Sequence, residues 1–372
     1  MLVEALTATA RFILEFPKAS LALFVTSLVF YYAIVYPFFL SPLRSIPGPY
    51  LHRISRLFAL NDQRTQHWIS KVHKLHQKYG RVVIIAPNEI SVDGDHKFVQ
   101  DIYVRNFPKL PFYRNFKNHG SRDNMFSEET NERHLQYRKL LLPLYQKTSI
   151  FSPVNSTRGV LCEKISQLVD QVYLLLVSGL EPDFINELLV HNEYGKGHGK
   201  NGHWLDISEG KNLGIEMYSL FGLLAMDMVL SFELGKQNGT DLLLHPENRH
   251  IIILHRLQAG MGFWTTLAPR LWDWAATPEI LEASKTIEKW QLGLYAKAET
   301  NVPDTKDGQN LSSLEQPKLK GLHKENAYSF LLDNIFSGHE TTAIQLTYLT
   351  YAISRPCNFE LQERLIQEIR KE

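Results

Sequence analysis

The stretch Phe336-Ser337-Gly338-His339-Glu340-Thr341-Thr342 places an acid and an alcohol side by side in a sequence that predicts a helix. Apolar residues recur at three- and four-residue spacing on both sides of it, as on one face of a helix. Gly338 costs such a helix about 1 kcal/mol relative to alanine, and the Thr341 hydroxyl can bond to the carbonyl of Ser337 in competition with the backbone ladder. We therefore expect a loosened turn, with room for a small molecule beside Gly338 and a proton source at Glu340.

Two other interpretations of this stretch are open at first. His339-Glu340 begins like the zinc-protease signature H-E-x-x-H, but Ala343 occupies the position of the second histidine, so the pair of metal ligands is absent. An ordinary buried helix with a glycine-threonine kink also accounts for the motif when it is taken alone. The motif alone does not distinguish a kinked core helix from a helix that binds a small molecule beside its acid and alcohol. The rest of the sequence is needed for that distinction.

The same arrangement resembles the oxygen-activating helix of the cytochrome P-450 haem-thiolate monooxygenases, whose pattern is Ala/Gly-Gly-x-Asp/Glu-Thr-Thr/Ser. Ser337 replaces the usual alanine or glycine. The resemblance implies that Glu340 and Thr341 are catalytic and deliver protons during oxygen activation. It also implies that Gly338 makes room for oxygen beside the cofactor.

Composition excludes several other classes of protein. The chain has 372 residues, is 44% hydrophobic, and balances 40 lysine and arginine residues against 39 acidic ones. Without a basic patch, nucleic acid is not an expected partner. The two cysteines, Cys162 and Cys357, form neither a disulfide framework nor a C-x-x-C metal pair, which fits a reducing, cytosol-facing compartment.

A membrane anchor is predicted near the N-terminus. Residues 19–36 carry no charge, span ~27 Å as a helix, and are extended by the apolar residues 37–40. A cleaved signal peptide would have a shorter apolar region followed by small residues. Basic residues are slightly more frequent after the span, which favours a cytosolic body and membrane lipid as a partner. We expect residues 1–18 to be a short lumenal segment and residues 19–40 to be the anchor.

Residues 41–50 are expected to be a hinge, because Ile46-Pro47-Gly48-Pro49 fits neither a helix nor a strand. Beyond it, residues 68–79 predict an amphipathic helix that ends at Gly80. The β-branched residues 81–85 and residues 89–92 predict two short strands. An apolar anchor, a Pro-Gly-Pro hinge and this small β-region together resemble the microsomal P-450 arrangement.

Residues 110–127 are rich in aromatic side chains and show no period. In the family the corresponding loop covers the substrate pocket, which implies pocket roles for Phe112, Tyr113 and Phe126. An aromatic surface loop is the alternative for any one of them. His134 and Arg138 follow, four residues apart on one face of a predicted helix. The resemblance implies that both bind haem propionates, whereas alone they could be a solvated basic face.

The middle of the chain contains several weaker signals. A long apolar-periodic helix is predicted from Asn155 to Val177, and the Gly/His-rich residues 195–203 predict a solvated loop rather than a metal site. Asp227 with Phe232 resembles a helix of the family, and the tryptophan-rich residues 263–274 predict a pocket cover or packed core. Three sequons, which we take as chance matches, begin at Asn155, Asn238 and Asn310.

Three family features do not occur in the sequence: the E-x-x-R helix, a Pro/Arg loop and the haem loop F-x-x-G-x-R-x-C-x-G. Neither Cys162 nor Cys357 has the glycine and arginine that surround the ligand cysteine in the family. The resemblance therefore implies a mainly α fold with a small β-region, a cytochrome P-450 domain over residues 51–372 that is incomplete at its C-terminus. Haem b is the expected cofactor, but its proximal thiolate ligand is absent from this chain.

The resemblance is closest to fungal membrane-bound members. It implies a single-pass protein of the endoplasmic reticulum that hydroxylates or epoxidises a small lipophilic secondary metabolite with electrons from an NADPH-cytochrome reductase. Because the ligand-bearing segment is absent, we expect the chain as given to be truncated and inactive. The alternative is a non-enzymatic, membrane-tethered remnant that binds partners or lipophiles.

Overall fold

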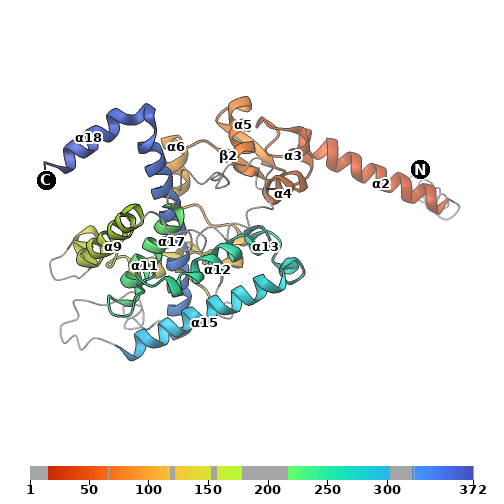
Figure 1. The fold of residues 1–372 in the computed structure, drawn as a ribbon. Coiled ribbons are helices and arrows are strands. Elements are labelled where there is room, and N and C mark those ends of the chain that lie inside the picture. The colour runs from red at the N-terminus through yellow and green to blue at the C-terminus, as the bar shows by residue number, and fades with distance from the viewer. Residues whose placement is uncertain are drawn as a thin grey trace, which may run out of the picture. The chain divides into compact units, whose positions relative to one another are not determined.

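The computed structural model describes residues 16–65, 67–117, 122–151, 157–177, 217–301, 321 and 323–371, and most of these are helical (Figure 1). The mainly α fold with a small β-region is confirmed. The chain divides into two compact units, Met1–Phe107 and Pro108–Glu372. The division into a lumenal segment, anchor, hinge and single body stays a prediction.

The first unit contains two apolar helical segments, several short helices and one β-hairpin. Its elements are α2 (Pro17–Phe30), the π-helix η1 (Tyr31–Leu40), α3 (Tyr50–Ile54), α4 (Leu57–Arg64), α5 (Trp68–Tyr79), β1 (Val82–Ala86), β2 (Glu89–Val92), α6 (His96–Val99) and the π-helix η2 (Gln100–Val104). The predicted helix and hairpin are confirmed. Gly80 ends α5 with a φ of 96°, and the two strands pair antiparallel with Val83 opposite Ser91.

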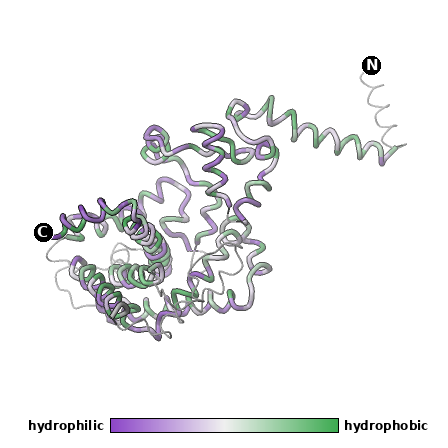
Figure 2. Tube along the Cα trace, turned by 45° about the horizontal axis from the view of Figure 1, so that its top comes forward, coloured by the Kyte–Doolittle hydropathy of each residue, from purple (hydrophilic) through white to green (hydrophobic). Residues whose placement is uncertain are grey.

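The apolar segment Pro17–Leu40 is almost wholly exposed, with 6% of its most apolar window buried. Figure 2 shows no continuous hydrophilic stripe along this helix. Pro37 lies inside the π-helix and has no N–H for the carbonyl of Tyr32 five residues earlier. The Tyr50 hydroxyl donates to the carbonyl of Ala33 at 3.2 Å, so the first helix of the body is bonded to the end of the apolar segment.

The Pro-Gly-Pro segment is docked on the hairpin. The N–H of Ile84 donates to the carbonyl of Pro47 at 2.9 Å. A Cβ at Gly48 would lie 2.8 Å from the carbonyl oxygen of Ile84, closer than such atoms approach. Glycine is therefore required at position 48 by the packing of the segment against β1.

The second unit is built from helices around a buried centre. Its elements are the 3₁₀ helix η3 (Pro111–Phe116), α7 (Asn131–Leu141), α8 (Lys147–Ile150), α9 (Thr157–Val177), α11 (Met217–Leu234), η6 (Pro246–Asn248), α12 (His250–Ala259), α13 (Gly262–Thr266), η7 (Pro269–Leu271), α14 (Trp272–Ala275), α15 (Pro278–Thr300), α17 (Lys324–Ser354), η8 (Pro356–Asn358) and α18 (Phe359–Ile369). The Gly/His-rich residues 195–203 and two of the sequons, Asn155 and Asn310, lie outside the described residues.

Helix α11 is the centre of this unit. It packs against α9, α12 and α17 and buries Met226 and Leu230 completely. Its 18 residues are apolar enough to cross a membrane, but 72% of them are buried, as expected for a helix that is apolar on all sides.

Asp227 explains how the chain turns after α11. Its buried carboxylate accepts hydrogen bonds from the Thr240 hydroxyl at 2.7 Å and from the N–H groups of Leu242 and Leu243 at 2.8 and 3.1 Å. Burial raises the pKa of Asp227, and these three bonds oppose that shift by stabilising the charged form. The sequon residue Asn238 lies in the same turn and is buried, so it is not accessible for modification in the folded chain.

We predict that Gly48→Ala destabilises the first unit by about 1–3 kcal/mol, because the new methyl group overlaps the backbone of β1. The measurement is hydrogen exchange of the β1 amides in the full chain. Gly94→Ala is the control, because a Cβ there would meet no atom within 4 Å. Equal exchange in both variants would show that the segment is not packed on the strand.

Candidate functional site

The quoted motif lies in the middle of α17. Side chains of the first half of this helix are buried on several sides, including Phe330, Leu331 and Ile335. The Thr341 hydroxyl donates to the carbonyl of Ser337, so the bond predicted from the sequence is present. Both Ser337 and Thr341 are exposed. The side of α17 that carries the Thr341 hydroxyl is thus exposed, and below it is called the open side of α17.

Gly338 lies where α17 meets α11. A Cβ at this position would be 2.8 Å from Cγ2 and 3.4 Å from Cβ of Val229. Valine is stiff at χ1 and cannot move aside cheaply. The structure therefore gives Gly338 a packing role that the sequence did not indicate, and its role in making room for oxygen stays a prediction.

Glu340 points toward α11 and α12. One of its carboxylate oxygens accepts a hydrogen bond from the Tyr218 hydroxyl, and the other lies 3.7 Å from Nε2 of His339. The Arg256 guanidinium covers the Tyr218 ring at 4.1 Å from its centroid and donates to the Ser219 hydroxyl at 2.8 Å. The Glu340 side chain is 25% exposed, so these polar contacts hold the acid at the edge of the core.

Two buried histidines, His255 and His339, lie beside this acid. The rings of His255 and His339 meet edge to face at 5.2 Å, and Nδ1 of His339 lies 3.0 Å from the carbonyl of Ile335. Burial, with a smaller contribution from His339, lowers the pKa of His255 to about 3. Burial also lowers the pKa of His339. Both rings are therefore neutral at pH 7, and neither adds a positive charge beside Glu340.

Tyr218, His255 and Arg256 were not predicted as site residues. They lie between 84 and 122 positions before Glu340 and belong to no local motif. The sequences of α11 and α12, which carry these residues, show apolar periodicity but no motif that points to a functional site. A tyrosine, a histidine and an arginine within two largely apolar helices do not identify Glu340 as their partner.

The predicted pocket residues Phe112, Tyr113 and Phe126 are brought together. Ring centroids lie 4.3 Å apart for Phe112 and Tyr113 and 5.2 Å apart for Tyr113 and Phe126. Phe116, which was not predicted, packs on Phe126 at 4.9 Å. Helix α13, from the tryptophan-rich stretch, packs against η3. These residues form one aromatic cluster, Phe112, Tyr113, Phe116 and Phe126.

The aromatic cluster is bonded to α17. The N–H of Phe126 donates to the carboxylate of Asp333, and the Ser329 hydroxyl donates to the carbonyl of Arg122 at 3.1 Å. The Lys109 ammonium donates to the carbonyls of Met125 and Phe126 at 2.8 and 2.9 Å. Burial raises the pKa of Asp333 to about 6 and lowers the pKa of Lys109.

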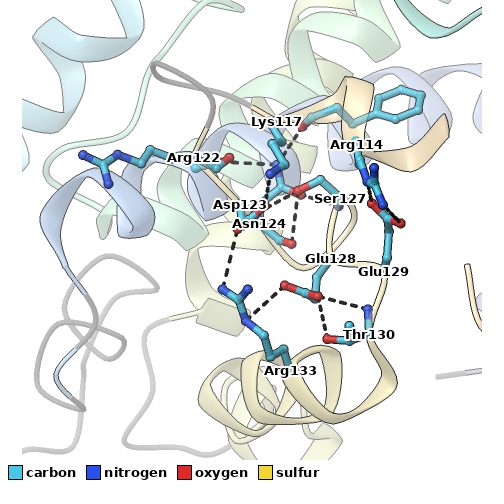
Figure 3. A network of polar contacts seen from close by, with 12 residues as sticks. Arg114, Lys117, Arg122, Asp123, Asn124, Ser127, Glu128, Glu129, Thr130 and Arg133 are labelled. Carbon is cyan, nitrogen blue, oxygen red and sulfur yellow. Dashed lines mark hydrogen bonds and ion pairs between the residues drawn. The ribbon is translucent and has the colours of Figure 1, made fainter. Parts of the chain in front are cut away.

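A polar network fixes the start of α7 (Figure 3). Arg133 lies 3.3 Å from the Glu128 carboxylate and 3.6 Å from Asp123, and Glu128 also accepts from the N–H and hydroxyl of Thr130. Glu128 is only 5% exposed, so these bonds compensate for the burial of its charge. The network orients the helix that carries His134 and Arg138.

His134 is half-buried and Arg138 is exposed on α7. Burial lowers the pKa of His134, and the positive charges of Lys109 and Arg138 lower it further. The two predicted propionate ligands therefore interact electrostatically with a further side chain, Lys109, that was not predicted. The Lys109 and Arg138 cations and the neutral His134 imidazole can all donate hydrogen bonds to a dicarboxylate such as the propionates of haem.

The two cysteines of the chain both lie at the surface of the second unit. Cys162 lies on α9 and Cys357 in η8, and both are exposed. Among the described residues no three His, Cys, Asp or Glu side chains are grouped so that they could hold a metal ion. The residues that are present fit the carboxylates of haem and an oxygen-side acid and alcohol.

Comparisons with known proteins identify relatives of one kind. No protein-family model matches the chain. The chain is 24% identical over 331 residues to "Cytochrome P450 monooxygenase FGM1" of Gibberella zeae. The aligned residues cover 84% of the chain and 58% of that protein. It is 30% identical over 141 residues to "Pisatin demethylase" of Fusarium vanettenii, covering 37% of the chain and 27% of that protein. It is 44% identical over 71 residues to "Cytochrome P450 monooxygenase FUP2" of Fusarium proliferatum, covering 19% of the chain and 14% of that protein.

These matches confirm the resemblance stated from the sequence. The chain spans a little over half the length of FGM1, 58% of that protein.

We predict opposite effects for the same substitution at two helical glycines. Gly338→Ala should cost about 1–3 kcal/mol of unfolding free energy, because the methyl group overlaps Val229. Gly293→Ala in α15 should gain about 0.5–1 kcal/mol, because nothing lies within 4 Å of its Cβ position. Urea midpoints in detergent provide the measurement. A gain at Gly338 would contradict the close approach of α11 and α17.

We further predict that Asp333 makes stability fall as the pH rises. Its pKa is about 6 in the folded chain against an ordinary 3.8, so its contribution is fully present below pH 3.8 and is lost as the pH passes 6. The change is at most about 3 kcal/mol. Asp333→Asn can still accept the N–H of Phe126 and should remove this part of the profile. Urea midpoints from pH 4 to 7 provide the measurement.

The control is Asp273→Asn on α14, an exposed aspartate. It should leave the pH profile of the original chain unchanged. If Asp333→Asn and Asp273→Asn give the same profile, the carboxylate of Asp333 is not the group that titrates.

Proposed function

We propose that this chain, a homologue of fungal cytochrome P450 monooxygenases, forms the membrane-anchored, oxygen-side part of a haem-thiolate monooxygenase. The observation that carries the proposal is the open turn of α17, where the Thr341 hydroxyl bonds to Ser337 beside the acid Glu340. Two further groupings support it. One is the aromatic cluster bonded to α17, and the other is the set of donors Lys109, His134 and Arg138 on α7 and the preceding loop.

Glu340 and Thr341 move protons in this proposal. Thr341 faces the open side of α17, where its hydroxyl can exchange Ser337 for another acceptor. Glu340 faces inward, where Tyr218 holds its carboxylate and the histidines beside it are neutral. The acid is thereby oriented by a hydrogen bond from a phenol rather than by a positive charge on either histidine.

Lys109, His134 and Arg138 would bind the propionates of haem. Arginine suits this task because its planar fork can bind a carboxylate through two parallel bonds. Haem, when bound, would supply the redox-active iron at which oxygen is reduced. The residues of this chain contribute cofactor binding, proton movement and a boundary for the substrate.

The substrate of the proposed enzyme is a small lipophilic metabolite. The aromatic cluster offers apolar ring surface, and the Lys109 ammonium lies 5.6 and 5.7 Å from the Tyr113 and Phe126 ring centroids. The exposed apolar segment Pro17–Leu40 supports an anchor in the endoplasmic reticulum with the body in the cytosol. An NADPH-cytochrome reductase would deliver the electrons.

A second candidate function is a membrane-tethered protein that binds partners or lipophiles without catalysis. The outer side of α17 beyond the motif favours it, because Tyr348 and Tyr351 are 70% and 63% exposed. Helix α18 likewise exposes Phe359, Leu365 and Ile369. Apolar surface of this extent marks a binding site for another protein segment or for an apolar ligand.

We predict that the 372-residue chain with added haem gives no thiolate-type carbon-monoxide difference spectrum, since neither cysteine has the family's ligand loop around it. A fusion that adds the C-terminal part of FGM1 after Glu372 should give the thiolate band, because the oxygen-side residues are already in place. A thiolate band from the unfused chain would overturn the assignment of the cysteines. If neither the unfused chain nor the fusion gives a thiolate band, the second candidate function, a membrane-tethered protein without catalysis, is favoured.

A matched pair of variants in the fusion tests the propionate site. Arg138→Gln should increase the rate of haem loss to apomyoglobin about tenfold or more, because one charge-assisted bond is removed. Lys139→Gln, the neighbouring exposed residue on α7, should leave this rate unchanged. Equal rates in the two variants would exclude Arg138 from the cofactor site.

A further inference from the structure

Glu340 lies between two side chains that can bind its carboxylate in different ways. The Tyr218 hydroxyl donates to Oε1, and Nε2 of His339 lies 3.7 Å from Oε2. A bond from the phenol brings no charge, whereas a protonated imidazole would form an ion pair. The ion pair would stabilise the charged form of the acid and make it a weaker proton acceptor. The partner that holds Glu340 therefore affects the proton transfer proposed for it.

The imidazole of His339 can bind Glu340 only when it is protonated. Its Nδ1 lies 3.0 Å from the carbonyl of Ile335, and because a carbonyl only accepts, Nδ1 carries the proton of the neutral ring. Nε2 then presents a lone pair, which cannot donate to a carboxylate. Protonation of Nε2 would convert this contact into an ion pair. The charge state of His339 therefore decides whether it competes with Tyr218.

Arg256 of α12 holds the Tyr218 ring in place. Its guanidinium carbon lies 4.1 Å from the ring centroid, and its two Nη groups donate to the Ser219 hydroxyl at 2.8 Å and to the carbonyl of Tyr218 at 3.4 Å. A planar guanidinium stacks on an aromatic face through a cation–π attraction. The start of α11 is thus bound at the ring and at the backbone, in the position from which the phenol reaches Glu340.

The charge of Arg256 acts on His339 as well. Burial lowers the pKa of His339, and the Arg256 charge lowers this pKa further. The backbone carbonyl bonded to Nδ1 and the carboxylate of Glu340 oppose the shift. His255, whose ring packs against that of His339, is itself neutral, because burial lowers its pKa to about 3. The titratable and charged groups described around His339 are therefore Glu340 on α17 and His255 and Arg256 on α12, with Tyr218 of α11 bound to Glu340.

We propose that Arg256 is a positioning residue that selects the partner of Glu340. It holds the Tyr218 hydroxyl on the carboxylate and keeps the neighbouring imidazole from forming an ion pair with it. Arg256 acts on the acid through Tyr218 and His339, two side chains on different helices. The inference rests on the proposed function, in which Glu340 moves protons.

The experiment follows the His339 ring by nitrogen-15 NMR in the full chain in detergent. Histidine is labelled, and the signal is assigned by its loss in His339→Gln. We expect the pKa of His339 in the original chain to lie below the ordinary 6.5. Arg256→Gln should raise this pKa, because a repelling charge is lost and a released Glu340 can pair with the ring. The measurement needs no haem, so it is independent of the thiolate spectrum that tests the proposed function.

Two further variants separate the charge of Arg256 from its hold on Tyr218. Tyr218→Phe keeps the ring under the cation but removes the hydroxyl, and it should also raise the pKa of His339. Arg256→Lys keeps the charge but loses the planar fork. Its His339 pKa should lie between that of the original chain and that of Arg256→Gln. Arg270→Gln, at an exposed arginine of η7, is the control and should leave the pKa unchanged. Urea midpoints show whether each variant is folded.

Two results would overturn the proposal. Equal His339 titrations in Arg256→Gln and Arg270→Gln would show that Arg256 has no influence on the ring. An unchanged pKa in Tyr218→Phe would show that the phenol does not compete with the imidazole for Glu340, and this test holds even if Arg256→Gln does not fold. Either result would leave a thiolate band from the fusion unaffected. A missing band would instead contradict the proposed function without moving the His339 signal.

Discussion

The close approach of α11 and α17 determines the candidate site. The two helices meet at Gly338, where any side chain would overlap Val229. With α11 this close, Tyr218 near its start reaches Glu340 and bonds to its carboxylate. The same packing buries His339 against His255 of α12. A larger residue at the crossing would separate the helices and so remove the partners of the acid together with the dry surroundings of the two histidines.

Local features were predictable because neighbours in the chain determine them. The helix ending at Gly80, the adjoining hairpin and the Thr341–Ser337 bond each depend on residues within a few positions. The aromatic cluster also followed, because Phe112, Tyr113 and Phe126 lie within one loop that has to bury its rings. In each case the sequence separation is short, so that pattern and turn chemistry decide the structure.

Long-range partners could not be predicted from the sequence. Asp333 accepts from Phe126 about 200 residues earlier, and Lys109 joins the field of His134 from a different segment. Gly338 looked like space for a ligand, whereas its position against α11 also makes it a packing residue. A helical pattern states which residues share a face but not which neighbour covers that face. Packing against other helices decides this, and packing is a property of the whole unit.

The acid and the alcohol of the motif, though adjacent in sequence, serve different sides of α17. Adjacent helical residues point about 100° apart, so Thr341 faces the open side while Glu340 faces Tyr218. For the proposed chemistry, Glu340 has to release the phenol and turn toward Thr341. Such a turn is easier where the Thr341 hydroxyl already competes for the carbonyl of Ser337 and loosens the ladder. The neutral histidines add no positive charge that would hold the carboxylate inward. In the proposed mechanism the bond to Tyr218 is therefore the resting contact of the acid, which it leaves when it turns toward Thr341.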